Sequence, residues 1–180
     1  MMCEQRLELV LPHAALRDEF RAVVAEYRAE GESVDRSLEP VLDDFDEYLR
    51  QIAVFRQGQR VPRGYVPQTT YWSVLDGTTI VGLGRIRHEL SPALFYEGGH
   101  IGYTIRPSFR RKGFGTRQCA LLFEKALTDH GLRKVLITCN EENTASRRII
   151  EANGGVYEST VISRHSRKPV RRYWVRLDTA

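Results

Sequence analysis

The sequence has few cysteines and no run of apolar residues long enough to cross a membrane. Only Cys3, Cys119 and Cys139 occur among the 180 residues, and none has the spacing of a CxxC motif. An odd, scattered set of thiols favours neither a disulfide framework nor a zinc ribbon. The N-terminal residues reach charge at Glu4 without an apolar signal region. We therefore expect a soluble cytoplasmic protein with no membrane segment.

Metal-ligand spacing and internal repeats are also missing. The five histidines do not form an HExxH pattern, so the sequence predicts no metal site. No repeat, low-complexity tract or linker divides the chain. Its 42% hydrophobic content is sufficient for a substantial core, and the length favours one domain over residues 1–180.

Charge is divided unequally along the chain, although the formal total is only +4. Residues 1–53 contain 13 acidic and 6 basic side chains, a net −7, which leaves 10 acidic and 21 basic, or +11, for the remainder. An anionic ligand is thus expected in the second part. The acidic first part could attract a cationic acceptor, or it could be a set of solvated helix surfaces. Too few aromatics accompany the basic residues to favour nucleic-acid binding.

Hydrophobic periodicity predicts alternating strands and helices, which places the chain in the α/β (α+β) class. Asp76-Gly77 is a hairpin signal between two of the strands. Helical spacing predicts helices from Pro12 through Tyr27, from Pro40 through Ile52, over 116–130 and over 143–152. Strands are expected over 6–10, 69–75, 78–89, 97–105, 135–137, 157–162 and 170–177.

The segment from Ile105 to Thr116 combines the end of a strand, three consecutive cations and two glycines at the start of a helix. Glycines let the backbone approach phosphate oxygens, and the unpaired amides of a helix N-terminus favour negative charge. The spacing matches neither GxxxxGK[ST] nor GxGxxG. A pyrophosphate-bearing ligand is the expectation, with a solvated basic loop as the alternative.

This segment resembles the cofactor motif of the GNAT superfamily of N-acetyltransferases. Arg110-x-x-Gly113-x-Gly115 is similar to Q/R-x-x-G-x-G/A, and Asn143-x-x-Ser146 is similar to the N-x-x-A/S helix that follows it in the superfamily. The resemblance implies one acyl-CoA N-acyltransferase domain over residues 1–180, with acetyl-CoA as co-substrate and no metal. It also implies a mixed, mainly antiparallel central sheet, flanked by helices and splayed between the fourth and fifth strands.

The same resemblance assigns cofactor contacts. Pantetheine would pair with the backbone of the fourth strand, and phosphates would bind the amides of residues 111–116 with help from nearby cationic side chains. Asn143 would contact the pantetheine arm. The full set is Tyr103, Thr104, Ile105, Arg110, Arg111, Lys112, Gly113, Phe114, Gly115, Thr116 and Asn143.

Acetyl transfer to an amine needs a neutral nitrogen, so a base or a relaying water is expected. Glu97 and His100 precede Tyr103 in the predicted fourth strand, and either could act as that base. Resemblance to GNAT enzymes with a glutamate near the start of this strand favours Glu97, while histidine titrates near neutral pH. For each, the alternative is a surface carboxylate or a hydrogen-bonded strand histidine.

The sequence departs from the superfamily at its usual acid. Many members have a tyrosine seven residues after the helix asparagine, where this chain has Ile150. Tyr157 and Tyr173 are substitutes only if the fold brings them close. The leading prediction is direct acetyl transfer to a primary amine of a small molecule or peptide, and the alternative is a non-catalytic acyl-CoA-binding or sensing module. A homodimer is left open.

Overall fold

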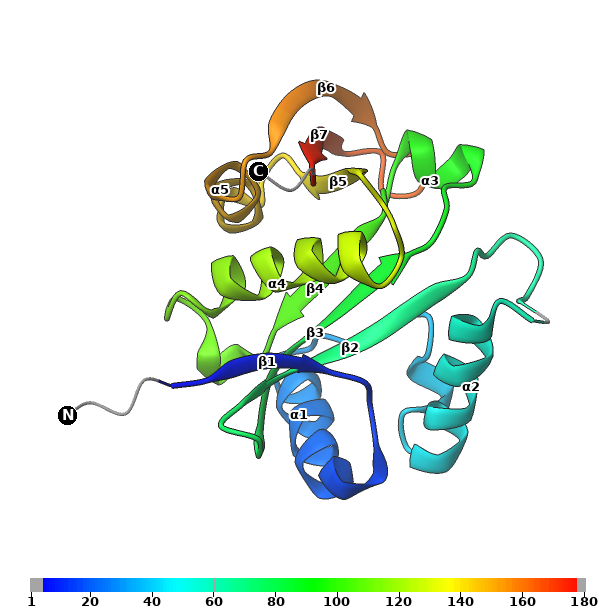
Figure 1. Ribbon diagram of the computed structural model, residues 1–180, viewed down its shortest axis with the longest axis vertical. Helices are drawn as coiled ribbons and strands as arrows, with labels where there is room; N and C mark the ends of the chain where they lie inside the picture. Colours follow the sequence, from blue (N-terminus) through cyan, green and yellow to red (C-terminus); the bar gives the residue numbers. More distant parts are fainter. Residues whose placement is uncertain (1–4, 60, 178–180) are drawn as a thin grey trace.

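A seven-stranded sheet in the order β1-β2-β3-β4-β5-β7-β6 forms the centre of the protein (Figure 1). The computed structural model describes residues 5–59 and 61–177. Its strands are β1 (Leu7–Val10), β2 (Gln68–Leu75), β3 (Thr79–Arg87), β4 (Ile101–Ile105), β5 (Lys134–Asn140), β6 (Val156–Ile162) and β7 (Pro169–Arg176). The α-helices are α1 (Arg17–Ala29), α2 (Phe45–Gln57), α3 (Pro92–Tyr96), α4 (Phe114–Thr128) and α5 (Thr144–Ala152).

Helices cover both faces of the sheet. In Figure 1, α1 and α2 lie on one side of the strands, and α4 lies on the other. Phe20 of α1, Tyr48 of α2 and Trp72 of β2 stack in the first core. Leu122 of α4 and Ile137 of β5 are buried in the second. This is the mixed, mainly antiparallel sheet flanked by helices that the sequence predicts.

Strands β4 and β5 form a parallel pair, in which the first residue of β4 meets the middle of β5. The register has a single match, Ile101 with Ile137. Just before it, the His100 amide donates to the Leu136 carbonyl at 2.7 Å, and the Leu136 amide donates to His100 Nδ1 at 2.9 Å. Beyond this apex the strands diverge, whereas β4 stays paired with β3 through Ile105. The opening is the predicted splay.

The predicted strand over 97–105 is too long at its N-terminal end. Ser91 caps the short helix α3 by accepting from the Leu94 amide at 3.3 Å, and Pro92 occupies its first turn. Gly98 and Gly99 then have φ of 114° and 65°, which interrupts extended backbone. Glu97 and His100 therefore both precede β4. The alternation of apolar and polar residues predicted a continuous strand and did not indicate the helix cap or the two-glycine turn.

The second predicted helix begins later than Pro40. This proline lies in the 3₁₀ turn Glu39–Val41, and α2 starts at Phe45 because Asp44 accepts from the Glu47 amide at 3.0 Å. The first predicted helix also begins later than Pro12, because a 3₁₀ turn at Ala14–Leu16 precedes α1, which starts at Arg17. The remaining predicted elements are confirmed to within a few residues. No helix in residues 5–59 or 61–177 is both long and apolar enough to cross a membrane.

Gly99 should be among the least replaceable residues of the apex. An added Cβ would lie 2.4 Å from the Leu136 carbonyl oxygen, whereas at Gly131, with a nearly identical φ of 64°, it would meet nothing within 4 Å. We expect Gly131→Ala to lower the free energy of unfolding by about 1 kcal/mol and Gly99→Ala by at least about 3 kcal/mol. Urea unfolding of both variants measures the difference, and equal losses would contradict the crowding at the apex.

Acidification should destabilise the protein before its carboxylates titrate. Burial lowers the pKa of His88, His100 and His130 below the usual value. The unfolded chain therefore binds protons near pH 6.5 while the folded chain does not, so the free energy of unfolding falls as pH falls through this window. Urea titrations at about pH 7.5 and about pH 5.5 test this, and His100→Asn should weaken the dependence. A pH-independent value would refute it.

Candidate functional site

The basic loop before α4 leaves a row of backbone amides unpaired. Gly113 stands at the helix N-cap with φ 81°, and the first bond of the helix runs from the Arg117 amide to the Gly113 carbonyl. The amides of residues 113–116 consequently have no acceptor within the helix. Gly113 is exposed, and an added Cβ there would meet nothing within 4 Å. This arrangement suits an anion.

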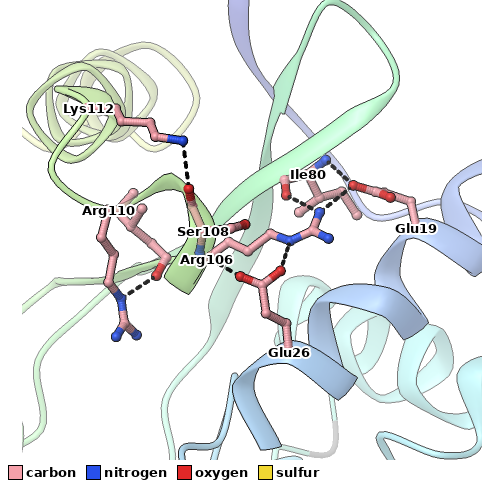
Figure 2. A network of polar contacts seen from close by, with 8 residues as sticks. Glu19, Glu26, Ile80, Arg106, Ser108, Arg110 and Lys112 are labelled. Atoms are coloured by element: carbon pink, nitrogen blue, oxygen red, sulfur yellow. Dashed lines mark hydrogen bonds and ion pairs between the residues drawn. The ribbon is translucent and has the colours of Figure 1, made fainter. Parts of the chain in front are cut away.

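Two carboxylates of α1 hold the strand end that leads into this loop (Figure 2). Arg106 donates from Nε to Glu26 and from Nη1 to Glu19, both at 2.6 Å. Glu26 also accepts from the Ser108 amide at 2.6 Å. Burial opposes the charge on Glu26, but these hydrogen bonds outweigh it and lower the pKa of Glu26. The loop is thus anchored to α1 independently of any ligand.

The three cations of the loop differ in what they can offer a phosphate. Arg110 is engaged, because its Nη1 and Nη2 bond to Glu32 at 2.9 and 2.6 Å and its Nε bonds to the Ile105 carbonyl. Lys112 donates to the Ser108 carbonyl at 2.8 Å, as Figure 2 shows. Arg111 is exposed, and no ion pair ties it to another described residue. The expected Arg110 phosphate contact would have to displace Glu32.

Only alternate residues of β4 turn their backbone toward the splay. Arg87 donates to the His100 carbonyl, and Arg106 donates to the Val81 carbonyl, so even-numbered residues between them face β3. Tyr103 therefore presents its amide and carbonyl, and Ile105 its amide, to the open side, whereas the Ile105 carbonyl accepts from Arg110 Nε at 3.1 Å. The backbone of Thr104 pairs with Leu83 of β3 and is not available for pantetheine. Of the three strand residues predicted to bind the cofactor, Thr104 could contact it only through its side chain, which lines the splay cavity.

A cavity of about 400 Å³ lies in the splay between β4 and α5. Asn143 lines it, although its Oδ1 is occupied as the cap of α5, accepting from the Ser146 amide at 2.9 Å; its Nδ2 is left for a ligand. The hydroxyls of Tyr103 and Ser146 lie 2.9 Å apart. Burial raises the pKa of Tyr103, so its phenol stays protonated. The cavity lining is Glu32, Tyr103, Thr104, Ile105, Arg110, Asn143, Ala145, Ser146 and Ile149.

Two further cavities adjoin the apex of the splay. One of about 250 Å³ is lined by Asp35, Arg85 and Arg87, and it shares Tyr103 and Thr104 with the splay cavity. The other, of about 600 Å³, opens among α3, the end of β5 and the β6–β7 loop. Arg87 lines both of them. A second substrate in the Asp35-side cavity could thus reach a ligand bound in the splay, because the two cavities share Tyr103 and Thr104.

Glu97 faces the larger of these cavities. Its Oε1 accepts from the Arg164 amide at 3.0 Å and lies 4.0 Å from His165 Nε2. These contacts connect the end of α3 to the β6–β7 loop. The carboxylate stands beside the β4–β5 apex without belonging to β4, in a position from which it could accept a proton.

His100 is poorly suited to be a base. Its Nδ1 already accepts from the Leu136 amide, so the neutral ring carries its proton on Nε2 and has no free lone pair. The side chain is 8% exposed, and burial lowers its pKa. We correct its expected role to that of a clamp between β4 and β5, the hydrogen-bonded histidine that the sequence had left as the alternative.

The tyrosines considered as substitutes for the missing acid lie elsewhere. Ile150 is fully buried in the core beneath α5. Tyr173 donates to Glu151, and Tyr157 is bonded to Thr160; neither lines the splay cavity. Sequence reasoning assigned no role to Tyr103 Oη or Ser146 Oγ, although Ser146 was visible as the last residue of its motif. In the described residues, no three acidic, histidine or cysteine side chains are placed to hold a metal ion.

Solved structures of acetyltransferases resemble this protein over nearly its whole length. RimL, a ribosomal L7/L12 α-N-protein acetyltransferase in complex with coenzyme A, aligns with TM-score 0.70 and 18% identity over 94% of this chain and 93% of that one. Microcin C7 self-immunity acetyltransferase MccE, in complex with acetyl-CoA and AMP, aligns with TM-score 0.69 and 13% identity over 94% and 92%. A chimeric spermidine N-acetyltransferase SpeG from Vibrio cholerae and hSSAT gives 0.64 and 15% over 97% and 96%.

These identities establish the fold, and the family follows from a separate comparison. A comparison with the curated proteins found no match. The family model for the acetyltransferase (GNAT) domain matches residues 6–156, from the start of β1 to the start of β6. The match includes the loop before α4, the splay and the Asn143 cap. The chain belongs to the GNAT acetyltransferase family and is an acyltransferase that uses acetyl-CoA.

Proposed function

We propose that this enzyme transfers the acetyl group of acetyl-CoA to a primary amine in a ternary complex, with residues 1–180 acting as one catalytic domain. The observation that carries the proposal is the meeting of the splay cavity with the Asp35-side cavity at Tyr103 and Thr104. Two substrates could approach one point from opposite sides of β4. The amine class is supported by the similar structures named for a ribosomal-protein α-amine and for spermidine.

In this proposal the cofactor lies along the open edge of β4. Its pyrophosphate binds the amides at the start of α4, which Gly113 exposes. Arg111, exposed beside them, adds positive charge. The pantetheine arm pairs with the backbone of Tyr103 and Ile105 and reaches Asn143 Nδ2. Gly115 is buried against Ile149, with only 2.6 Å between an added Cβ and Ile149 Cδ1, and so keeps α4 close to α5.

The chemistry requires one new C–N bond, one broken C–S bond and two proton movements. The amine nitrogen attacks the thioester carbonyl, whose developing oxyanion is stabilised by an outward-facing β4 amide. Glu97, directly or through a water, takes the proton that the nitrogen loses. The departing thiolate is protonated by the Tyr103–Ser146 hydroxyl pair, which lines the splay cavity. No cysteine needs to carry the acetyl group, since burial raises the pKa of Cys139.

Replacing Gly113 should weaken cofactor binding without lowering the free energy of unfolding more than the same replacement does at a control glycine. A side chain there would cover the amides, and we expect Gly113→Val to raise the dissociation constant of coenzyme A by ~10-fold or more. Gly131→Val is the matched control, because Gly131 lies beyond the other end of α4, also has positive φ and also faces open space. Calorimetric titration should show an unchanged constant for the control. Unchanged affinity in Gly113→Val would remove the loop from the cofactor site.

Incubation with acetyl-CoA and an amine panel should release one thiol per acetylated amine. Glu97→Gln should lower kcat by ~100-fold, with the KM for acetyl-CoA little changed. Glu89→Gln, which removes an exposed carboxylate that lines none of the three cavities, is the control and should behave as the parent enzyme. Absence of acceptor-dependent thiol release would contradict the proposed reaction, whereas an unchanged kcat in Glu97→Gln would exclude only Glu97 as the base.

A further inference from the structure

Arg87 is held at the junction of the two cavities on the acceptor side of the splay. Its Nη1 donates to the carbonyls of Gly98 and Gly99 at 3.2 and 2.8 Å. The left-handed backbone of these glycines turns the carbonyls toward it. The guanidinium is consequently fixed in place by one nitrogen, while Nε and Nη2 have no hydrogen-bond partner in residues 5–59 and 61–177.

The charge of Arg87 is not balanced by a carboxylate. Arg85 pairs with Asp35 at 3.0 Å, Arg106 with Glu19 and Glu26, and Arg110 with Glu32. No carboxylate of the described part of the chain lies within 4.0 Å of Arg87. Burial, reinforced by the neighbouring Arg85, lowers the pKa of Arg87 to about 10. A partly buried cation without a counter-ion is costly unless a ligand supplies one.

We propose that Arg87 binds a carboxylate of the acceptor, so that the enzyme selects amines that also carry a carboxylate. The inference rests on the proposed function and adds the substrate class. Arg87 lines the cavity that Glu97 faces and also the cavity that reaches Tyr103 and Thr104. An acceptor held by its carboxylate at Arg87 can place its amine between Glu97 and the thioester. The positive charge also disfavours polyamine acceptors at this point.

A monovalent carboxylate fits this position better than a phosphate. The free Nε and Nη2 form the edge of the guanidinium fork that receives a carboxylate in a bidentate pair. Asp35 offsets Arg85, which leaves the Asp35-side cavity with about one net positive charge, carried by Arg87. A dianionic phosphate would be repelled by Asp35 on one side and by Glu97 on the other. The carboxylate could belong to a free amino acid or to an acidic residue at a peptide N-terminus.

Matched acceptors test the proposal directly. Linear amino acids of increasing length are compared with their carboxamides, and peptides beginning with aspartate are compared with the same peptides beginning with asparagine. We expect kcat/KM to favour the carboxylate member of one series by on the order of 10- to 100-fold, the range for a hydrogen-bonded charge. The series that shows the preference identifies whether the carboxylate comes from an amino acid or a peptide.

Arg87→Met should bring the ratio of kcat/KM for the carboxylate acceptor to kcat/KM for its carboxamide close to unity. The change should come mainly through the KM of the carboxylate acceptor, with the KM for acetyl-CoA unchanged. Arg87→Lys, which keeps a charge without the fork, should retain part of the preference. Arg133→Met is the matched control, because Arg133 is exposed and lines neither of the two cavities that Arg87 lines; it should keep the full preference for the carboxylate acceptor. A ratio retained in Arg87→Met, or a preference of the parent enzyme for carboxamides or polyamines, overturns the proposal.

An amine-free carboxylate provides a test that needs no variant. It should inhibit acetylation of a neutral amine by the parent enzyme competitively with the amine and not with acetyl-CoA. Lack of inhibition, or competition with acetyl-CoA alone, contradicts binding at Arg87. If neutral and acidic amines are acetylated equally, the substrate class is wrong while the proposed function stands; if no amine yields thiol, the proposed function itself fails.

Discussion

The hydrogen bonds between His100 and Leu136 are the contacts on which the site depends. They hold the start of β4 against β5. One is a backbone hydrogen bond from the His100 amide to the Leu136 carbonyl, and in the other the Leu136 amide donates to the His100 side chain at Nδ1. Because β4 continues along β3 while β5 continues along β7, the two strands must separate beyond this point. The cavity, the free edge of β4 and the place of Glu97 all follow from that separation. Gly99 permits it by bringing its backbone within contact of Leu136.

Ion pairs then fix the walls around the opening. Arg106 attaches the entry of the basic loop to α1, and Arg110 attaches the loop to Glu32, beyond the end of α1. The acidic first part of the chain is therefore not only a solvated surface. Several of its carboxylates neutralise arginines of the second part, which accounts for much of the charge asymmetry seen in the sequence. Arg87 differs from Arg85, Arg106 and Arg110, because no described carboxylate lies within 4.0 Å of it.

The sequence was sufficient for the fold, and it also predicted the loop that we propose binds the cofactor, since both depend on local signals. Gly113 is required by its positive φ, and Gly115 is required by the close packing of α4 on α5. Both requirements can be inferred from the residues nearby in the sequence. The roles of Glu97, His100 and Thr104 were less accessible. The direction in which these residues face depends on the turn at Gly98 and Gly99 and on the register of β4 with β3. The alternation of residues along one strand does not predict either feature. Arg87 carried no signal, because the absence of a partner is a property of three-dimensional placement.

The short contact between β4 and β5 also bears on how the molecule assembles. Leu136 and His100 are 36 residues apart in the chain, with the whole of α4 between them, whereas β2, β3 and β4 follow one another in a local meander. Closing so long a connection costs chain entropy that one point of pairing repays slowly. The cleft can exist only after the two halves of the sheet have met, so we expect it to form after the β2–β3–β4 meander.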